Sequence, residues 1–237
     1  MPKVNEYHTL DEGAILRTLE ALARRVAERF PTRGLAQTAA YMIDLARKSA
    51  REARSLGQPS WLLRVLAVGM LALGVYGLYE LRNLLPDLKS GPINIADFTQ
   101  GLEASFNIVV LAAFATYFLF SLEGRLKRRR ALGGLYRLRA IAHVVDMHQL
   151  TKDPSSVVGL ERTGSSPERD LSDAQLLRYL DYCSEMLSMT GKLAALYAQR
   201  FPDGVVISAV NDIEDLTTGL SRKIWQKIVA VQGVARD

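Results

Sequence analysis

The sequence predicts an all-α integral membrane protein, in which a two-span transmembrane helical hairpin is joined to a cytoplasmic helical bundle. Three patterns in the 237 residues lead to this fold class. Two long apolar stretches interrupt a charged chain, lysine and arginine gather mainly beside one end of each stretch, and the remaining segments carry apolar residues at helical spacing. The mean hydropathy of +0.04 hides this division, because the charged segments offset the apolar ones.

The two apolar stretches, residues 61–79 and 104–122, are each long enough to cross a bilayer as a helix. Their 19 residues cover roughly 28 Å at a rise of about 1.5 Å per residue, which is close to one hydrocarbon thickness. Arg64 is the only charge in the first stretch, and the second has none. A pair of buried helices in a soluble protein is the weaker alternative, because such helices seldom run this long without a polar face.

Positive charges predict which side of the membrane each end occupies. Basic residues cluster before the first stretch and after the second, whereas the connecting segment 80–103 contains only Arg82 and Lys89. Because cytoplasmic flanks carry the excess of lysine and arginine, both termini should be cytoplasmic. We therefore expect a multi-pass protein of a bacterial-type inner (plasma) membrane, with residues 60–123 as the hairpin and segment 80–103 as a small exoplasmic loop.

A run of basic residues follows the second apolar stretch. Its members are Arg125, Lys127, Arg128, Arg129 and Arg130. Charges in this position anchor the topology and attract anionic lipid headgroups, by about 1 kcal/mol per charge. Nucleic acid, which the net charge of +5 also suggests, is a poorer partner because the run lacks interleaved aromatic residues. Anionic lipids are therefore the expected partner of this run.

Small residues on one face of each apolar stretch predict close packing of helices, either within the hairpin or between subunits. In lipid, where packing rather than water exclusion drives association, small side chains let two backbones approach. Gly74, Gly77 and Ala112 lie on these faces, and Asn107 is the one strong hydrogen-bonding side chain within the stretches. We expect Asn107 to hold helices together rather than to bind an ion.

Charged helices are predicted on both sides of the hairpin. Residues 1–59 should form N-terminal cytoplasmic helices, the first of which opens with a capping box of Thr9 and Glu12. Residues 124–151 should form a basic membrane-proximal helix. Residues 152–170 have the serine, glycine and proline content of a flexible loop.

Residues 171–237 are predicted to form an antiparallel helical hairpin. Ser172 and Gln175 make a capping box, after which apolar residues follow a heptad rhythm as far as Phe201. A short turn at residues 202–204 leads to a last helix with the same rhythm. These long amphipathic surfaces, typical of coiled coils, predict a bundle that associates with itself to give a homo-oligomer or docks a cytosolic protein.

One stretch, IAHVVDMHQLTKDP at residues 141–154, suggests chemistry because two histidines and two aspartates lie close together. On a helix, His143 and Asp146 share a face with Arg139, whereas His148 points to the opposite side, so three metal ligands do not converge. We predict no catalytic residue, metal or cofactor. Arg139, His143 and Asp146 are interpreted as a polar or partner-facing stripe.

Two functions fit these patterns better than an enzyme based on the His143 region does. The first is a non-enzymatic inner-membrane protein whose cytoplasmic bundle mediates self-association or docking of a cytosolic partner. The alternative is an oligomeric channel or membrane-disrupting effector, since the layout resembles, in architecture alone, that of small bacterial pore-forming defence proteins. A single two-span hairpin cannot enclose a pore, so this alternative requires several subunits.

Overall fold

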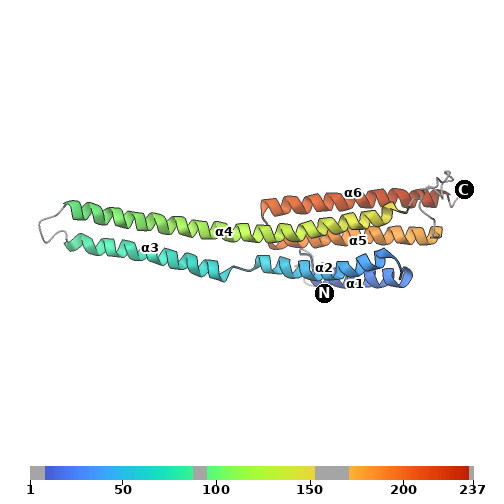
Figure 1. The fold of residues 1–237 in the computed structure, drawn as a ribbon, viewed down its shortest axis with the longest axis horizontal. Coiled ribbons are helices and arrows are strands. Elements are labelled where there is room, and N and C mark those ends of the chain that lie inside the picture. Colours follow the sequence, from blue (N-terminus) through green and yellow to red (C-terminus); the bar gives the residue numbers. More distant parts are fainter. Residues whose placement is uncertain (1–8, 88–94, 153–170, 235–237) are drawn as a thin grey trace, which may run out of the picture. The chain divides into compact units, whose positions relative to one another are not determined.

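The structure is a computed structural model that describes residues 9–87, 95–152 and 171–234. Every regular element within these ranges is an α-helix, and two of the helices are long and apolar, which confirms the all-α part of the predicted fold (Figure 1). The chain divides into two compact units. The smaller contains residues 58–129, and the larger contains the segments before and after it.

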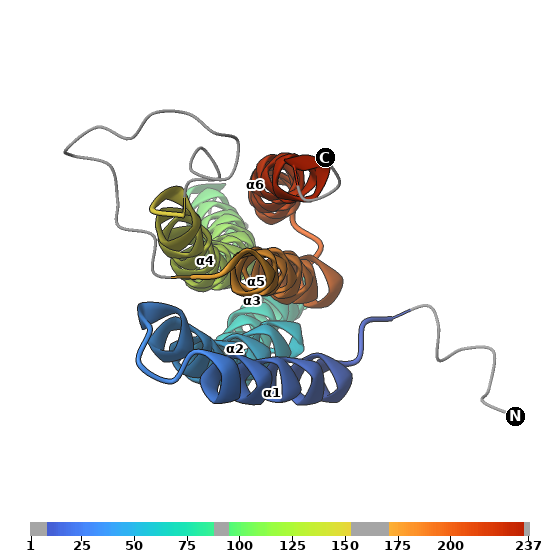
Figure 2. The same cartoon turned by 90° about the vertical axis from the view of Figure 1, so that its right-hand side faces the viewer.

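The larger unit is a helical bundle, called the bundle below. Its members are α1 (Glu12–Arg29), α2 (Gly34–Gly57), the part of α4 from residue 130 onward, α5 (Asp173–Arg200) and α6 (Gly204–Val234). Seen end-on, α5 lies in the middle, with α1 and α2 on one side and α4 and α6 on the other (Figure 2). This central position explains why α5 buries more side chains than α1 or α2.

The predicted heptad rhythm of the last two helices corresponds to their buried faces. The buried positions include Leu176, Leu180, Cys183, Leu187, Ala194 and Tyr197 on α5, and Val206, Val210, Ile213, Leu220, Ile224 and Val231 on α6. Burial of one large apolar side chain contributes about 2 kcal/mol to folding. The two faces therefore supply a large part of the force that holds the bundle together.

The ends of these helices lie where local sequence signals predict them. The backbone N–H of Gln175 donates to the Ser172 hydroxyl at 3.3 Å, and the Ser172 N–H donates to the Gln175 side chain at 3.0 Å. This reciprocal pair is the predicted capping box. The turn at residues 202–204 also stands as predicted, since α5 ends at Arg200 and α6 begins at Gly204.

The start of α1 differs from the prediction. Asp11, rather than Thr9, caps the helix, because its carboxylate accepts the backbone N–H two residues ahead at 2.7 Å. The Glu12 carboxylate is bound elsewhere, to Arg54 at 3.0 Å and to Arg200 at 3.2 Å. The predicted capping box of Thr9 and Glu12 is therefore wrong, because two arginines from neighbouring helices hold Glu12.

The smaller unit, called the hairpin below, consists of α3 (Trp61–Asp87) and the N-terminal part of α4, which as a whole spans Ile95–Leu150. Both helices run beyond the apolar stretches, because hydropathy marks where apolar residues stop and not where a helix stops. The predicted loop 80–103 is therefore too long, since only residues 88–94, outside the described ranges, separate the two helices.

The segment that follows the hairpin is helical, as predicted. Residues 124–150 form the last part of α4, which continues from the second apolar stretch without interruption and ends at Leu150. The residues here favour a helix as strongly as the apolar residues before them do, so the change in polarity does not end it. Most of the predicted loop 152–170 lies outside the described residues.

Three helices of the bundle meet at a polar contact. The Tyr197 hydroxyl donates to a Glu52 carboxylate oxygen at 2.9 Å, and the Arg137 guanidinium donates to the same oxygen at 2.5 Å. Burial, the main cause, raises the pKa of Tyr197, so its hydroxyl remains a donor at neutral pH. Gly134 leaves room for this contact, because a Cβ at that position would overlap the Tyr197 hydroxyl. The contact joins α2, α4 and α5.

Candidate functional site: the apolar hairpin

Small residues bring α3 and α4 together within one chain. A Cβ added to Gly74 would lie 3.0 Å from the Ala112 Cβ, and one added to Gly77 would lie 2.9 Å from the Ile108 Cγ2. Ala67, further along the same face of α3, is 2% exposed. Gly74, Gly77 and Ala112 therefore lie in a contact inside the hairpin, which is one of the two packing alternatives left open by the sequence.

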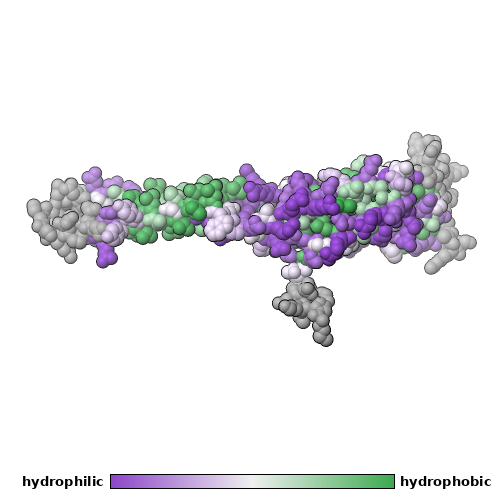
Figure 3. Space-filling view, turned by 90° about the horizontal axis from the view of Figure 1, so that it is seen from below, coloured by the Kyte–Doolittle hydropathy of each residue, from purple (hydrophilic) through white to green (hydrophobic). Residues whose placement is uncertain are grey.

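Large apolar side chains of both helices face outward. Exposed examples are Leu62, Val65, Val68, Leu71 and Val75 on α3, and Phe106, Leu111, Phe114, Tyr117 and Phe120 on α4. Few residues in the most apolar part of either helix are buried, 17% in α3 and 6% in α4. Figure 3 shows the resulting apolar surface on the face in view. Two helices are thus long and apolar enough to cross a membrane.

Asn107 lies on the outer surface of the hairpin. The face of α4 that contacts α3 runs through Ile108 and Ala112. Because neighbouring residues on a helix differ by about 100° in direction, the Asn107 side chain turns away from this face, and it is exposed. Asn107 therefore does not join α3 to α4, contrary to the simplest form of the expectation that it holds helices together.

A carboxylate fixes one end of the hairpin. Glu123, which is 8% exposed, accepts hydrogen bonds from the Lys127 ammonium at 2.8 Å and from the Ser60 backbone N–H at 3.1 Å. Ser60 directly precedes α3, so its N–H is one of the donors that a helix start leaves unpaired. The hydrogen bond from Lys127 is the main cause that holds the pKa of Glu123 below its usual range. An ionised Glu123 thus ties the start of α3 to α4.

This role of Glu123, the residue that follows the second apolar stretch, was not predicted from the sequence. The available signal was the spacing of four residues between Glu123 and Lys127, which places an acid and a base on the same face of a helix. Ser60 could not be found in this way. Its contact depends on how α3 and α4 fold back on each other.

The basic run after the hairpin has two kinds of members. Arg125, Arg129 and Arg130 are exposed and Arg128 is half-buried, whereas the Lys127 side chain is only 15% exposed and is bound to Glu123. Lys127 therefore stabilises the hairpin. The exposed guanidinium groups keep the positive surface that the sequence predicts.

The predicted polar stripe on the last part of α4 is mostly open to solvent. Arg139 and His143 are exposed. Asp146 is half-buried and accepts a hydrogen bond from the Gln149 side-chain amide at 2.6 Å. The stripe therefore presents Arg139 and His143 to the surroundings, while Asp146 is engaged within its own helix.

His148, on the opposite side of α4, packs against α2. Its Nε2 lies 2.9 Å from the Thr38 Oγ1, and a Cβ on Gly34 would lie 2.7 Å from its Cε1. The Thr38 hydroxyl already donates to the Gly34 carbonyl at 3.0 Å, so we assign the proton of this contact to the His148 Nε2. Burial, followed by the charge of Lys152, lowers the pKa of His148. This packing role was not predicted.

Metal-binding side chains do not gather in the part of the chain that the structure describes. No three or more histidine, cysteine, aspartate or glutamate side chains there are placed to hold a metal ion. Cys183 is buried, and burial raises the pKa of its thiol to about 12, so the thiol is protonated at neutral pH. Comparisons with protein-family models, curated proteins and solved structures gave no significant match. Function is therefore inferred from the surfaces of the two units.

Proposed function

We propose that the protein is a non-enzymatic integral membrane protein whose helical bundle lies in the cytoplasm and acts by self-association or by docking a cytosolic protein. One observation carries the proposal. Most of the large apolar side chains of the hairpin are exposed, whereas most of those of the bundle are buried. Soluble monomers seldom expose apolar patches of more than a few hundred Å², so lipid is the surrounding that suits this surface.

Charged residues bound the apolar surface of the hairpin at both ends. The contacts of Gly74 with Ala112 and of Ser60 with Glu123 make α3 and α4 antiparallel. Arg64 and Glu123 therefore belong to one end of the hairpin, and Glu80 and Glu103 to the other. Apolar side chains between two polar ends are the pattern of a membrane span.

The orientation in the membrane follows from the basic flanks. Arg125, Arg129 and Arg130 are exposed next to the end of the hairpin that contains Glu123. Such charges favour the cytoplasmic side and an anionic leaflet. We place both termini in the cytoplasm of a bacterial-type cell, with the hairpin in its inner membrane.

Insertion is tested by placing charges on the outward face of the hairpin. Leu71→Asp combined with Phe114→Asp introduces two carboxylates near the middle of the apolar surface, each at about 2.5 to 3.5 kcal/mol against insertion. We expect this variant to leave the membrane fraction or to be degraded, as judged by fractionation and alkaline extraction. Tyr41→Asp changes an exposed aromatic residue of the bundle and should stay with the membrane. Full retention of the double variant would show that the hairpin is not the anchor.

Topology and mode of action need separate measurements. A reporter fused after residue 90 should behave as exported and one at the C-terminus as cytosolic, and the reverse result would overturn the orientation. Purified protein in nanodiscs should show a defined mass or capture a cytosolic protein through the bundle. Ion flux through liposomes by a higher oligomer would instead favour the channel or membrane-disrupting alternative.

A further inference from the structure

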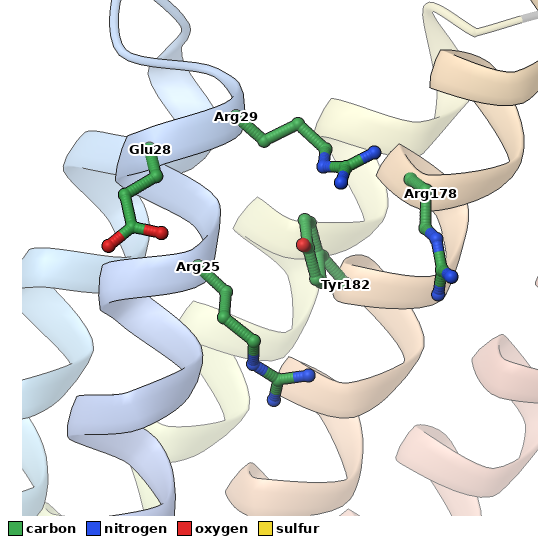
Figure 4. A pocket seen from close by; sticks show the side chains of 5 residues that line it. All are labelled: Arg25, Glu28, Arg29, Arg178 and Tyr182. Atoms are coloured by element: carbon green, nitrogen blue, oxygen red, sulfur yellow. The ribbon is translucent and has the colours of Figure 1, made fainter.

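An arginine-lined hollow lies between α1 and α5 of the bundle. Its volume is about 390 Å³, and its lining residues are Arg25, Glu28, Arg29, Arg178 and Tyr182. In Figure 4 the three guanidinium groups surround the Tyr182 ring, while the Glu28 side chain points away from it. The groups that converge over Tyr182 are therefore positively charged.

Nearby carboxylates pair with two of the three arginines, one closely and one loosely. Arg25 binds Glu185 at 2.7 Å, and the Arg178 guanidinium lies 3.6 Å from the Asp181 carboxylate. Both pairs are about half exposed, so their attraction is weakened by solvent. The closer of the two pairs engages Arg25 firmly, whereas Arg178 keeps most of its donors available.

Arg29 has no carboxylate partner among the described residues. It belongs to the last turn of α1, where a positive charge is favoured by the helix dipole. The dipole explains a basic residue at this helix end but not the direction of its side chain. The guanidinium extends toward Tyr182 and Arg178, where a second positive charge opposes it unless an anion lies between them (Figure 4).

Tyr182 forms the floor of the hollow and is 6% exposed. Its ring is held by an edge contact with Phe30, at 6.2 Å between centroids, and by the Arg25 guanidinium at 5.9 Å. Among the described residues its hydroxyl has no hydrogen-bond partner. A fixed hydroxyl beside several guanidinium groups gives a set of donors, which suits an anion with several acceptor oxygens.

We propose that this hollow binds a phosphate-bearing anion. The guanidinium groups of Arg29 and Arg178 and the hydroxyl of Tyr182 donate to its oxygens, while Arg25 remains on Glu185 and holds the ring. A guanidinium matches phosphate through two parallel hydrogen bonds, and binding removes the repulsion between Arg29 and Arg178. A small phosphate compound and a lipid headgroup present the same oxygens. The proposal does not depend on the membrane role of the hairpin.

The test titrates the full chain in detergent with inorganic pyrophosphate at low ionic strength, with binding measured by calorimetry and with sodium chloride as the ionic-strength control. We expect Arg29→Gln and Arg178→Gln each to weaken binding about 10-fold, as one charge-assisted contact is lost. Tyr182→Phe keeps the ring and should weaken binding about 3-fold. Arg24→Gln removes an exposed arginine of the same helix outside the hollow and should change the affinity less than about 2-fold.

Competition then distinguishes the two sources of phosphate. Displacement of pyrophosphate by a soluble short-chain phosphatidylglycerol would support a lipid headgroup as the ligand, and binding without displacement would support a free phosphate compound. Absence of pyrophosphate binding to the unmodified chain would overturn the proposal. Equal weakening by Arg24→Gln and Arg29→Gln would also overturn it, because it would show attraction to general positive charge. Circular dichroism of each variant confirms that its helices are intact.

Discussion

In the bundle, large side chains such as Leu187, Met186 and Tyr197 fill the interior; in the hairpin, Gly74 and Ala112 occupy the contact and large apolar side chains point outward. The same helical element is therefore packed in opposite ways. In water, the hydrophobic effect drives large apolar side chains into the interior. In apolar surroundings this effect is absent, and helices associate through close contact between their backbones. The difference supports the proposal that lipid surrounds the hairpin and water surrounds the bundle.

Each unit nevertheless uses a carboxylate to join segments that are distant in the sequence. In the bundle, Glu52 accepts from Tyr197 and Arg137, and in the hairpin, Glu123 accepts from Lys127 and the backbone of Ser60. Both carboxylates have a basic partner, so neither is removed from water as an isolated charge. The two units thus differ in how their apolar side chains pack, but in both of them the carboxylate is paired with a basic residue.

The largest effect on stability is expected when Gly134, a small residue inside the bundle, is enlarged. Gly134→Ala places a Cβ onto the Tyr197 hydroxyl and separates it from Glu52, so we expect a loss of about 2 to 4 kcal/mol in the free energy of unfolding. Gly133→Ala is the matched control, because its Cβ meets only the flexible end of Arg137 at 3.9 Å. It should stabilise the helix by up to about 1 kcal/mol. Thermal unfolding followed by circular dichroism measures both.

If the two substitutions change the free energy of unfolding in opposite directions, the close contact lies at Gly134 and not at Gly133. Equal stabilisation by both alanines would contradict it, since it would mean that Tyr197 moves aside without loss. The pair thus tests whether the interior of the bundle is filled as tightly as its buried side chains indicate.

A smaller effect is expected when a large residue enters the contact of the hairpin. Gly74→Leu cannot fit against Ala112 and should destabilise the α3–α4 contact by about 1 to 3 kcal/mol. Gly69→Leu, at a position with nothing within 4 Å of the added Cβ, should leave the contact unchanged. Unfolding of the protein in nanodiscs is the measurement. If Gly74→Leu were as stable as the wild type, small residues would not define the hairpin contact.

Acid should act on the hairpin through Glu123. The pKa of this carboxyl is held below its ordinary value of 4.5, so its contribution is complete above about pH 4.5 and disappears as the pH falls through the lowered value. Glu123→Gln keeps an acceptor for the Ser60 N–H but has no charge for Lys127. We expect this variant to be less stable than the wild type at neutral pH, and the difference to disappear as the pH falls from 4.5 through the lowered pKa of Glu123. A constant difference between the two across this range would contradict the role of the charge.

Features that follow from the regular spacing of residues along a helix could be predicted from the sequence. Contacts that depend on how distant segments approach each other in space could not. The buried faces of α5 and α6 follow from apolar residues at heptad positions, and the capping box at Ser172 follows from residues three apart. Both patterns are complete within one segment of the chain. The presence of two long apolar helices, α3 and α4, was predicted on the same basis, from the length of two apolar stretches.

Contacts between distant segments could not be predicted in this way. Nothing in the sequence distinguishes Gly134, which the Tyr197 hydroxyl covers, from its neighbour Gly133. The arginine-lined hollow combines Arg29 with Arg178 from another helix, and each looks alone like an ordinary surface charge. The extents of α3 and α4 were misjudged for a different reason, since polarity changes within a helix that local propensity continues.

The smallest effect that we expect is a difference in the pH at which each unit loses stability. Burial lowers the pKa of His148 below its ordinary value of 6.5, so the unfolded chain binds the proton more readily, and the bundle should lose stability as the pH falls below about 6.5. The Glu123 contribution to the hairpin persists until below about pH 4.5. His148→Gln retains a donor for Thr38 and should remove the loss between pH 7 and 5.5, measured by thermal unfolding. If the variant and the wild type lost stability in parallel over this range, another group would control the response of the bundle, and the contrast in pH between the two units would not rest on His148.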